Sequence, residues 1–381
     1  MRALVFERKP VKYVAAAVAG RLRPGRGASV GPLSLQDVDE PAAPGDGWVR
    51  VRPRLAGICG SDLATLDGHS SRYFEPIVSF PFVPGHEVVG ELDDGTRVVL
   101  VPVLTCEPRG VTPPCPWCAA GQPNRCERIA FGHLEPGLQT GFCESTGGGW
   151  STAFVAHRSQ LVAVPDDLSD EDAVIVEPAA CAVHAARTVL PGDVAVIGAG
   201  TLGLLTIAAL RHLGSERTVV ATAKHPHQRQ LATELGADRV VATGELARAV
   251  RSMTGAMVIG EQLTSGLTTV VDCVGSDDSV AQALSVAAPG GDVLLVGMPG
   301  PRSSLDLTPL WHRETSIRGC YAYTRDDFDT AIELVRARGL GRLVSATYPL
   351  ARYRDAIDHA ANAGGRGAVK IAFDLRQEKG R

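Results

Sequence analysis

The segment from Val194 to Leu213 constrains the fold of this chain more than any other. Four apolar residues, Val194–Ile197, lead into the turn Gly198-Ala199-Gly200-Thr201-Leu202-Gly203 and then into an apolar stretch with helical periodicity. In a G-x-G-x-x-G turn the first glycine forms the tight bend, the second lets a pyrophosphate approach the backbone, and the third lets the helix pack on the strand. A glycine turn in an unrelated α/β protein is the weaker alternative, because a second strand follows in the expected order. We therefore predict a dinucleotide-binding unit whose contacts are Gly198, Gly200, Thr201, Leu202 and Gly203.

The residues after that second strand indicate which dinucleotide binds. A NAD-binding unit usually carries Asp or Glu about 20 residues past the last glycine, where it bonds the ribose 2′-hydroxyl. This chain reads Thr222-Ala223-Lys224-His225 and has no carboxylate in that window. Lys224, helped by His225 or Arg229, would attract a 2′-phosphate. The sequence therefore favours NADP(H) over NAD(H), and an ordinary solvated lysine is the alternative.

The rest of the chain predicts two domains. Its 381 residues exceed the size of about 250–300 residues at which a single core stops growing. From Arg2 to about Val164 short strands alternate with Gly and Pro, which predicts a mostly β region. After Leu168 apolar strands alternate with Ala/Leu-rich helices, which predicts βαβ units in a doubly wound parallel sheet. The tail holds two amphipathic helices, near 328–338 and 353–362, and a final strand.

Composition limits the partners of the protein. The formal net charge is −4 and Lys and Arg are scattered, so we expect no nucleic acid partner. The longest apolar stretch, Val194–Leu210, is interrupted by three glycines and is shorter than the roughly 20 residues that span a bilayer, so we expect no membrane partner. The apolar run Tyr13–Ala19 is too short for a secretory signal, which favours a cytoplasmic location.

Four of the nine cysteines crowd into one loop and predict a metal site. They are Cys106, Cys115, Cys118 and Cys126. Four thiolates can surround one tetrahedral zinc ion and leave no position open for substrate, so this zinc would be structural. Reactive thiols are the weaker alternative.

Three other fragments could share a second ion. They contain Cys59 in Gly57-Ile58-Cys59-Gly60-Ser61-Asp62, His86 in Gly85-His86-Glu87, and Glu177 before a proline. One thiolate, one imidazole and one carboxylate leave a coordination position open, as a catalytic zinc requires. Taken singly, however, each residue has an ordinary structural explanation, and spacing alone does not join them.

The order of these fragments resembles the zinc-dependent medium-chain dehydrogenase family, which includes alcohol, sorbitol, threonine and glucose dehydrogenases. The resemblance covers nearly the whole chain. It is carried by Gly57–Asp62, Gly85–Glu87, the cysteine loop with its specific segment Gly121-Gln122-Pro123-Asn124-Arg125-Cys126, and the glycine turn.

The resemblance implies a GroES-like catalytic domain, residues 1–177 completed by 320–381, and a Rossmann domain, residues 178–319, with the active site in the cleft. It implies zinc ligands at Cys59, His86 and Glu177, with Glu87 as an occasional ligand. Ser61 would receive the substrate proton and Asp62 would support the ligands. Glu177 stands where classical alcohol dehydrogenases have cysteine, which favours polyols, sugars and secondary alcohols. A homodimer or homotetramer is also implied.

Three departures from the family pattern limit this transfer. Cys106 and Cys115 are separated by eight residues where the family usually has two, so Cys143 is an alternative to Cys106. Leu63 and Ala64 occupy the place of a relay histidine, so a proton relay would use His69, the cofactor ribose or water. Residues 13–31 form an N-terminal extension to which the family pattern assigns no role.

The sequence therefore predicts a zinc-dependent NAD(P)-dependent alcohol or polyol dehydrogenase. In the reaction it implies, the substrate oxygen binds zinc, Ser61 takes the hydroxyl proton and a hydride passes to the nicotinamide. Two alternatives remain, a zinc-free quinone or enoyl reductase and a non-catalytic NADP(H)-binding protein. The cysteine loop and the Gly-His-Glu segment argue against the first, and the intact ligand set argues against the second.

Overall fold

The structure is a computed structural model that describes residues 1–214, 216–300 and 305–378. The chain forms two compact units, Met1–Glu177 with Val335–Arg381, and Pro178–Leu334. The chain returns to the first unit later than residue 320, the start we expected for the returning segment. The helix α12 (Arg325–Arg338) explains the later boundary. Its Asp327 accepts one hydrogen bond from Arg187 at 2.8 Å and lies 2.8 Å from His184 Nδ1, and both partners are on α6 (Val176–Thr188).

The first unit is built on one mainly antiparallel sheet with the order β16-β17-β3-β4-β5-β7, and β6 pairs with β3. Only β16 and β17 run parallel to each other. The long strand β3 bends across the unit, so that its first half pairs with β6 and its second half with β4 and β17. The strands of this sheet are β3 (Trp48–Gly57), β4 (Val88–Glu91), β5 (Arg97–Leu100), β6 (Phe154–His157), β7 (Leu161–Ala163), β16 (Val344–Tyr348) and β17 (Lys370–Asp374).

Short helices connect the strands of the first unit. They are α3 (Gly60–Leu66), α4 (Pro116–Ala119), α5 (Asp170–Ala173) and α13 (Tyr353–Ala361), with 3₁₀ turns η1 (Arg72–Ile77), η2 (Pro123–Arg125), η3 (Arg158–Gln160), η5 (Leu340–Leu343), η6 (Leu350–Arg352) and η7 (Gly364–Arg366). The hydroxyl of Ser169 caps α5 by accepting the N–H of Asp172 at 3.0 Å.

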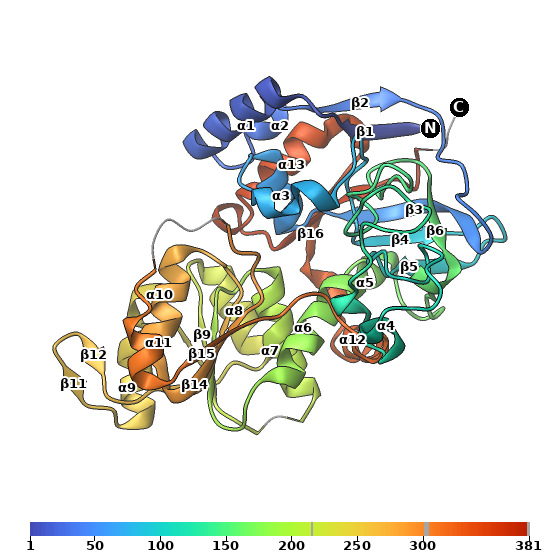
Figure 1. Ribbon diagram of the computed structural model, residues 1–381. Coiled ribbons are helices and arrows are strands. Elements are labelled where there is room, and N and C mark those ends of the chain that lie inside the picture. Colours follow the sequence, from blue (N-terminus) through green and yellow to red (C-terminus); the bar gives the residue numbers. More distant parts are fainter. Residues whose placement is uncertain (215, 301–304, 379–381) are drawn as a thin grey trace. The chain divides into compact units, whose positions relative to one another are not determined.

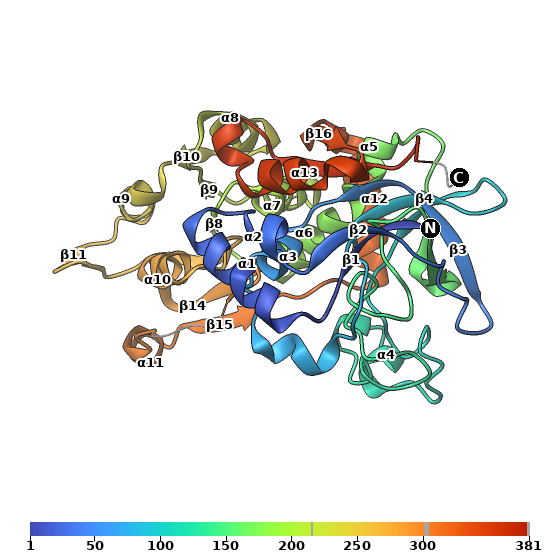
Figure 2. The same ribbon diagram turned by 90° about the horizontal axis from the view of Figure 1, so that it is seen from above.

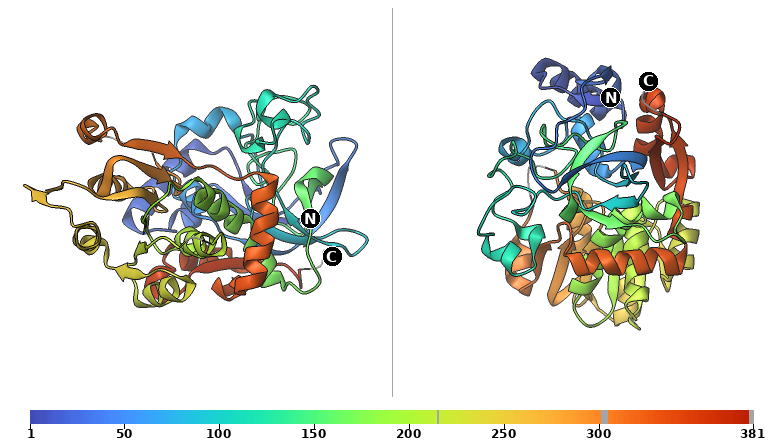
Figure 3. Two further views of the ribbon diagram at one scale, coloured as in Figure 1. Left: turned by 90° about the horizontal axis from the view of Figure 1, so that it is seen from below. Right: turned by 90° about the vertical axis from the view of Figure 1, so that its right-hand side faces the viewer.

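The N-terminal extension is helical, which the sequence pattern did not indicate. The strands β1 (Arg2–Phe6) and β2 (Leu33–Asp37) form a separate antiparallel pair. The helices α1 (Pro10–Leu22) and α2 (Gly27–Val30) lie between these two strands in the sequence. The two helices pack beside α3 and α13 at an edge of the first unit (Figures 1 and 2). In the right-hand view of Figure 3 they are the dark-blue helices at the top, beside the N-terminus.

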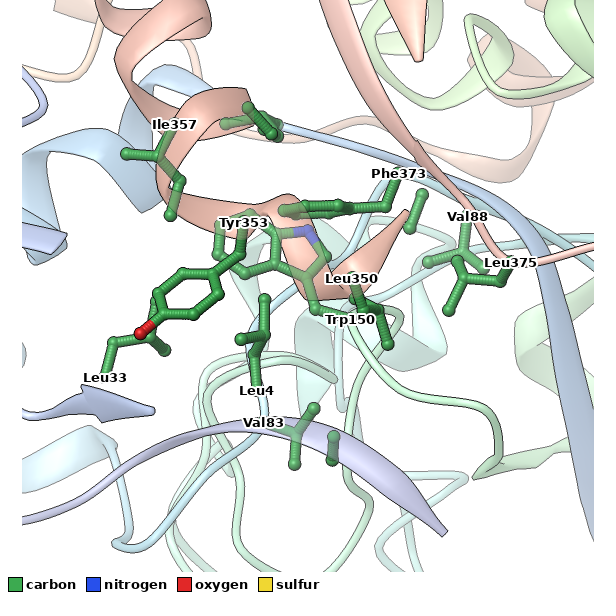
Figure 4. Close-up of a cluster of buried hydrophobic side chains, with 14 of the residues drawn as sticks. Leu4, Leu33, Val83, Val88, Trp150, Leu350, Tyr353, Ile357, Phe373 and Leu375 are labelled. Carbon is green, nitrogen blue, oxygen red and sulfur yellow. The ribbon is translucent and has the colours of Figure 1, made fainter. Parts of the chain in front are cut away.

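The core of the first unit joins the two ends of the chain. Buried side chains from the N-terminal strands pack with side chains from the C-terminal segment (Figure 4). Trp150 is fully buried, lies edge-on to Phe373 at 5.1 Å, and donates its indole N–H to the Gly57 carbonyl at 3.1 Å. The C-terminal segment is therefore part of the first core, as the resemblance implied.

The second unit contains a six-stranded sheet with the order β10-β9-β8-β13-β14-β15, and all its neighbouring strands are parallel. The strands are β8 (Val194–Ile197), β9 (Val219–Thr222), β10 (Arg239–Val241), β13 (Leu267–Asp272), β14 (Ala287–Leu295) and β15 (Ser316–Gly319). This is the doubly wound order. The first three strands are added toward one edge of the sheet and the next three toward the other, so the strand order reverses between β8 and β13.

Helices α7 (Thr201–His212), α8 (Pro226–Leu235), α9 (Leu246–Thr254), α10 (Asp277–Val286) and α11 (Thr308–Arg313) connect these strands, together with η4 (Thr243–Glu245) and the hairpin β11 (Val258–Ile259) and β12 (Gln262–Leu263). The central strands β8 and β9 are buried throughout and almost wholly apolar, as expected where helices cover both faces of a sheet. None of the described helices has the length and apolarity that crossing a bilayer requires.

Candidate active site and metal centres

The nucleotide turn has the geometry that its glycines predict. Gly198 has a φ of +91°, and a Cβ there would lie 2.4 Å from Val274 Cγ2. A Cβ on Gly203 would lie 1.8 Å from the Gly198 carbonyl oxygen, so only glycine allows α7 to pack this closely. A Cβ on Gly200 would meet no atom within 4 Å. The turn therefore leaves open space at the N-terminus of α7, beside Thr201 and Leu202, where a phosphate group can approach free N–H groups.

The three residues expected to read the ribose follow β9. Lys224 is exposed and makes no hydrogen bond or ion pair with any described residue. The His225 ring stacks on His227 with centroids 5.9 Å apart. Arg229 donates from Nε to the Ala223 carbonyl at 3.1 Å, which holds its guanidinium against the end of the strand. All three lie beside the turn that follows β9, and the exposed Lys224 is available to a ligand.

Cys59, Asp62 and His86 lie together in the first unit. Cys59 is the N-cap of α3, and Asp62 in the first turn accepts the Cys59 N–H at 2.9 Å through Oδ2. Its other oxygen lies 3.5 Å from His86 Nδ1, and both side chains are buried. Burial alone would lower the pKa of His86, but the Asp62 carboxylate and Cys59 outweigh it and raise that pKa well above its ordinary value.

This arrangement fits a metal site. The buried atoms Asp62 Oδ1 and His86 Nδ1 have no hydrogen-bond partner among the described residues. A carboxylate beside one ring nitrogen orients an imidazole so that the other nitrogen can bind a metal. Asp62 is therefore placed to hold His86 while it also fixes the backbone at Cys59.

Glu87 is paired with a lysine that the sequence motifs did not reveal. Lys370 on β17 forms an ion pair with Glu87 and donates to the Ile58 carbonyl at 3.1 Å, and both charged side chains are buried. Burial alone would lower the pKa of Lys370, but the Glu87 carboxylate outweighs it and raises that pKa. A Cβ on Gly57 would lie 2.1 Å from Glu87 Oε2, so the glycine makes room for the pair. The one signal in the sequence is a lysine at the start of a strand whose next three residues are apolar.

The other expected residues surround this group less tightly. Glu177 is buried in the first turn of α6 and within electrostatic range of Lys370. The donor atoms of Cys59, His86 and Glu177 do not all fall within 4.8 Å of one another. Ser61 is half-buried two residues after Cys59. His69 is exposed beyond the end of α3, and its backbone N–H bonds the Ala64 carbonyl at 2.7 Å.

The four loop cysteines do come together. The ligand atoms of Cys106, Cys115, Cys118 and Cys126 all lie within 4.8 Å of one another, and this is the one such group among the described residues. The sulfurs of Cys106 and Cys126 are 3.7 Å apart, close to the edge of about 3.8 Å of a tetrahedron with Zn–S bonds of about 2.3 Å. Burial raises the pKa of the Cys115 thiol, but the N–H groups of Cys118 and Glu127 outweigh it and lower that pKa to about 6. Cys115 is therefore the thiol most readily present as thiolate, the form that binds metal, whereas burial raises the pKa of the Cys118 and Cys126 thiols.

Cys143, the alternative to Cys106, lies elsewhere. It is buried against apolar residues and donates its thiol to the Glu135 carbonyl at 3.4 Å. The insertion between Cys106 and Cys115 does not displace Cys106, because its chain folds back and the Cys115 N–H donates to Cys106 Sγ at 3.3 Å.

That insertion contains a fully buried arginine, Arg109, which the sequence motifs also did not reveal. Its guanidinium donates to five backbone carbonyls, those of Leu104, Phe131, Leu134, Glu135 and Gly137. Burial lowers the pKa of Arg109. The loop around the cysteines has little regular secondary structure, and the Arg109 side chain donates the hydrogen bonds that its carbonyl groups would otherwise receive from a helix or sheet.

Comparison with known proteins places the chain in a family. Residues 45–166 match the model described as alcohol dehydrogenase GroES-like domain, and residues 201–337 match the one described as zinc-binding dehydrogenase. A probable D-xylulose reductase A from Arthroderma otae is 30% identical over 308 residues, which is 77% of this chain and 80% of that protein. The chain belongs to the zinc-dependent medium-chain dehydrogenase family. It is an oxidoreductase with a GroES-like and a Rossmann-type domain, as the sequence predicted.

Other members of the family extend the likeness. An L-idonate 5-dehydrogenase from Vitis vinifera is 28% identical over 346 residues, which is 86% of this chain and 88% of that protein. Among solved structures, a putative zinc-binding dehydrogenase from Sinorhizobium meliloti bound to NADP has a TM-score of 0.72 and 26% identity, over 91% of this chain and 97% of that one. The likeness to these dehydrogenases thus covers most of both chains.

Proposed function

We propose that this dehydrogenase is zinc-dependent and transfers a hydride between a polyol, sugar or secondary alcohol and NADP(H). The observation that carries the proposal is the buried group of Cys59, Asp62 and His86, in which the Asp62 carboxylate lies 3.5 Å from Nδ1 of the His86 ring. A carboxylate beside one ring nitrogen orients an imidazole so that its other nitrogen can bind a metal, and the nearby Cys59 thiol supplies a second ligand type. The group therefore argues against the zinc-free reductase alternative.

We assign the roles of the chain's own residues from their positions. Cys59, His86 and Glu177 would hold the catalytic zinc, which when bound polarises the substrate hydroxyl so that the nicotinamide can accept the hydride. Asp62 orients His86. Ser61, which directly precedes Asp62 in the first turn of α3, would accept the hydroxyl proton. His69 is exposed, so a relay of that proton through His69 would need water.

Glu87 contributes charge balance in this proposal. The two anionic candidate ligands, Cys59 and Glu177, balance a divalent ion, and Lys370 balances Glu87. Because the Glu87 carboxylate is already paired, we assign it to the support of the site and keep only an occasional contact with the metal for it. The four loop cysteines would hold a second, structural zinc.

The NADP(H) part of the proposal is supported by the exposed Lys224 and by the absence of a carboxylate at the end of β9. The S. meliloti relative, at 26% identity, is bound to NADP. The polyol and sugar part is supported by the names of the relatives, L-idonate 5-dehydrogenase and D-xylulose reductase. A homo-oligomer and a cytoplasmic location stay predictions from the sequence.

Metal analysis with a substrate screen tests this function. Purified protein should contain two zinc ions per chain and should reduce NADP with polyols, sugars or secondary alcohols. One zinc ion would indicate a structural site alone, and none would favour the zinc-free reductase. The ratio of kcat/KM for NADP and NAD tests the cofactor separately: the Lys224→Ala variant should lose affinity for NADP and not for NAD, and a wild-type preference for NAD would refute that part.

A further inference from the structure

The N-terminal extension has no part in the proposed function, yet it presents an unusual surface. Four large apolar side chains of α1 are exposed, Val11 at 85%, Val14 at 64%, Val18 at 57% and Leu22 at 82%. At 3.6 residues per turn they fall within an arc of about 80°. The opposite side of the helix is formed by Ala16 and Gly20, which are buried. Helix α1 therefore turns its larger apolar face, here called the α1 stripe, to the outside.

The α1 stripe is held in place by the protein. The buried carboxylate of Asp67 accepts the N–H groups of Gly25 at 2.7 Å and Gly27 at 2.9 Å. A Cβ on Gly20 would lie 2.6 Å from the Asp67 side chain, so the glycine lets α1 approach α3 closely. Arg23 forms an ion pair with Asp358 on α13 at 2.8 Å. The exposure of the stripe is therefore built into the fold and does not result from a loose chain end.

Cations flank the α1 stripe on both sides. On the helical wheel Arg21 lies about 20° beyond one edge of the arc and Lys12 about 80° beyond the other. Neither side chain, nor that of Arg26, makes a hydrogen bond or ion pair with any described residue. Residues 8–30 contain six Lys and Arg and no Asp or Glu, in a chain whose formal net charge is −4. Six of the 38 Lys and Arg of the chain thus lie on this helix and its flanks. Three of the six, Arg8, Lys9 and Arg23, form ion pairs, and the other three are available to a ligand.

We propose that α1 binds the surface of an anionic lipid bilayer, with the stripe among the acyl chains and the flanking cations at the headgroups. An apolar face bordered by Lys and Arg is the arrangement of helices that lie in a membrane interface. At about 20 Å the helix is too short to cross a hydrocarbon core of about 30 Å. The expectation of no membrane partner was based on spanning segments, and an interfacial helix needs none.

A second copy of the chain fits this surface less well. A two-fold contact between two α1 stripes would bring Lys12 and Arg21 of one copy against the same cations of the other, with no carboxylate in residues 8–30 to pair with them. An anionic bilayer supplies the complementary charge, at roughly 1 kcal/mol, or about fivefold in binding, for each cation near the surface.

Vesicle sedimentation tests the proposal with the full chain. Vesicles of phosphatidylcholine with 30% phosphatidylserine should bind the protein at least tenfold more tightly than pure phosphatidylcholine, and added salt should weaken the binding. The variant Val14→Ser/Val18→Ser should lose about tenfold or more. The variant Lys12→Gln/Arg21→Gln should lose about 25-fold.

The matched control removes exposed apolar residues from another surface. Met257 is 68% and Ile259 71% exposed at the β11–β12 hairpin, so Met257→Ser/Ile259→Ser should bind vesicles as the wild type does. Unchanged zinc content and melting temperature show that each variant is folded. Equal binding to both vesicle types, or no binding, would overturn the proposal. The proposal would also be overturned if the wild type binds no vesicles but self-associates in light scattering, and if Val14→Ser/Val18→Ser abolishes that self-association.

Discussion

The cysteine cluster takes all four thiols from the single segment 106–126, whereas the Cys59 site collects its side chains from segments near residues 59, 86 and 177. Each centre is supported by one buried cation, Arg109 in the first case and Lys370 in the second. Arg109 donates to backbone carbonyls and so holds a loop in shape. Lys370 neutralises a carboxylate and so adjusts the charge of a site. This difference supports our proposal that the cysteine cluster would stabilise the chain and that the Cys59 site would serve the reaction.

The comparison is tested most strongly by removing one thiol from each centre. We expect Cys59→Ser to lower kcat by about 10³-fold or more, because zinc supplies several kcal/mol of transition-state stabilisation, while the affinity for NADP is unchanged. Cys118→Ser should instead lower the melting temperature, because zinc binding at a structural site is coupled to folding. Steady-state kinetics, cofactor titration and calorimetry distinguish the two. Retained turnover in Cys59→Ser would refute the catalytic zinc.

Removing the cation of the Cys59 site should destabilise the fold through an unpaired charge. Lys370→Met leaves Glu87 buried without a partner, and we expect a loss of about 3–5 kcal/mol in the free energy of unfolding. The double variant Glu87→Gln/Lys370→Met removes both charges and should recover most of that loss. Urea denaturation measures both. If the double variant is as unstable as the single one, the two residues do not act as a charge pair.

Replacing Arg109 in the cysteine loop should have a smaller effect, because the substitution leaves no buried charge unpaired. Arg109→Lys keeps the charge but cannot reach five carbonyls, and we expect a loss of about 2–3 kcal/mol from unsatisfied buried groups. The exposed Arg128, which lies over the Phe131 ring at 5.8 Å, offers a matched control, and Arg128→Lys should change stability by less than about 0.5 kcal/mol. Zinc content after dialysis should fall only in Arg109→Lys. Equal stability of the two variants would show that Arg109 is dispensable.

The smallest effect is expected where a side chain only orients a ligand. Asp62→Asn retains the size of the side chain but removes the charge beside His86, and it should weaken zinc binding at the Cys59 site by about 10–100-fold. Competition with a chelator, followed by loss of activity, measures that affinity. The structural zinc should be unaffected, and a loss of both ions together would contradict the separation of the two centres.

Local patterns were sufficient to predict several features of the molecule. The glycine turn and its flanking strands are predictable because each glycine answers a steric need within a few residues. The cysteine loop is predictable because its ligands are neighbours in sequence. The order of the GroES-like and Rossmann-type regions came from the resemblance of short motifs, and the family assignment confirmed it.

The sequence by itself determined the nucleotide fold, the residue types of both candidate metal centres and the membership of the family, because these depend on periodicity and short motifs. Only the tertiary structure decided that Lys370 pairs with Glu87, that Arg109 supports the cysteine loop, and that residues 10–22 form a helix with its larger apolar face outward. A buried charge has a partner that is remote in sequence, and the exposed side of a helix depends on what packs against the other side. Such pairings arise from long-range packing and leave no periodic signal in the chain.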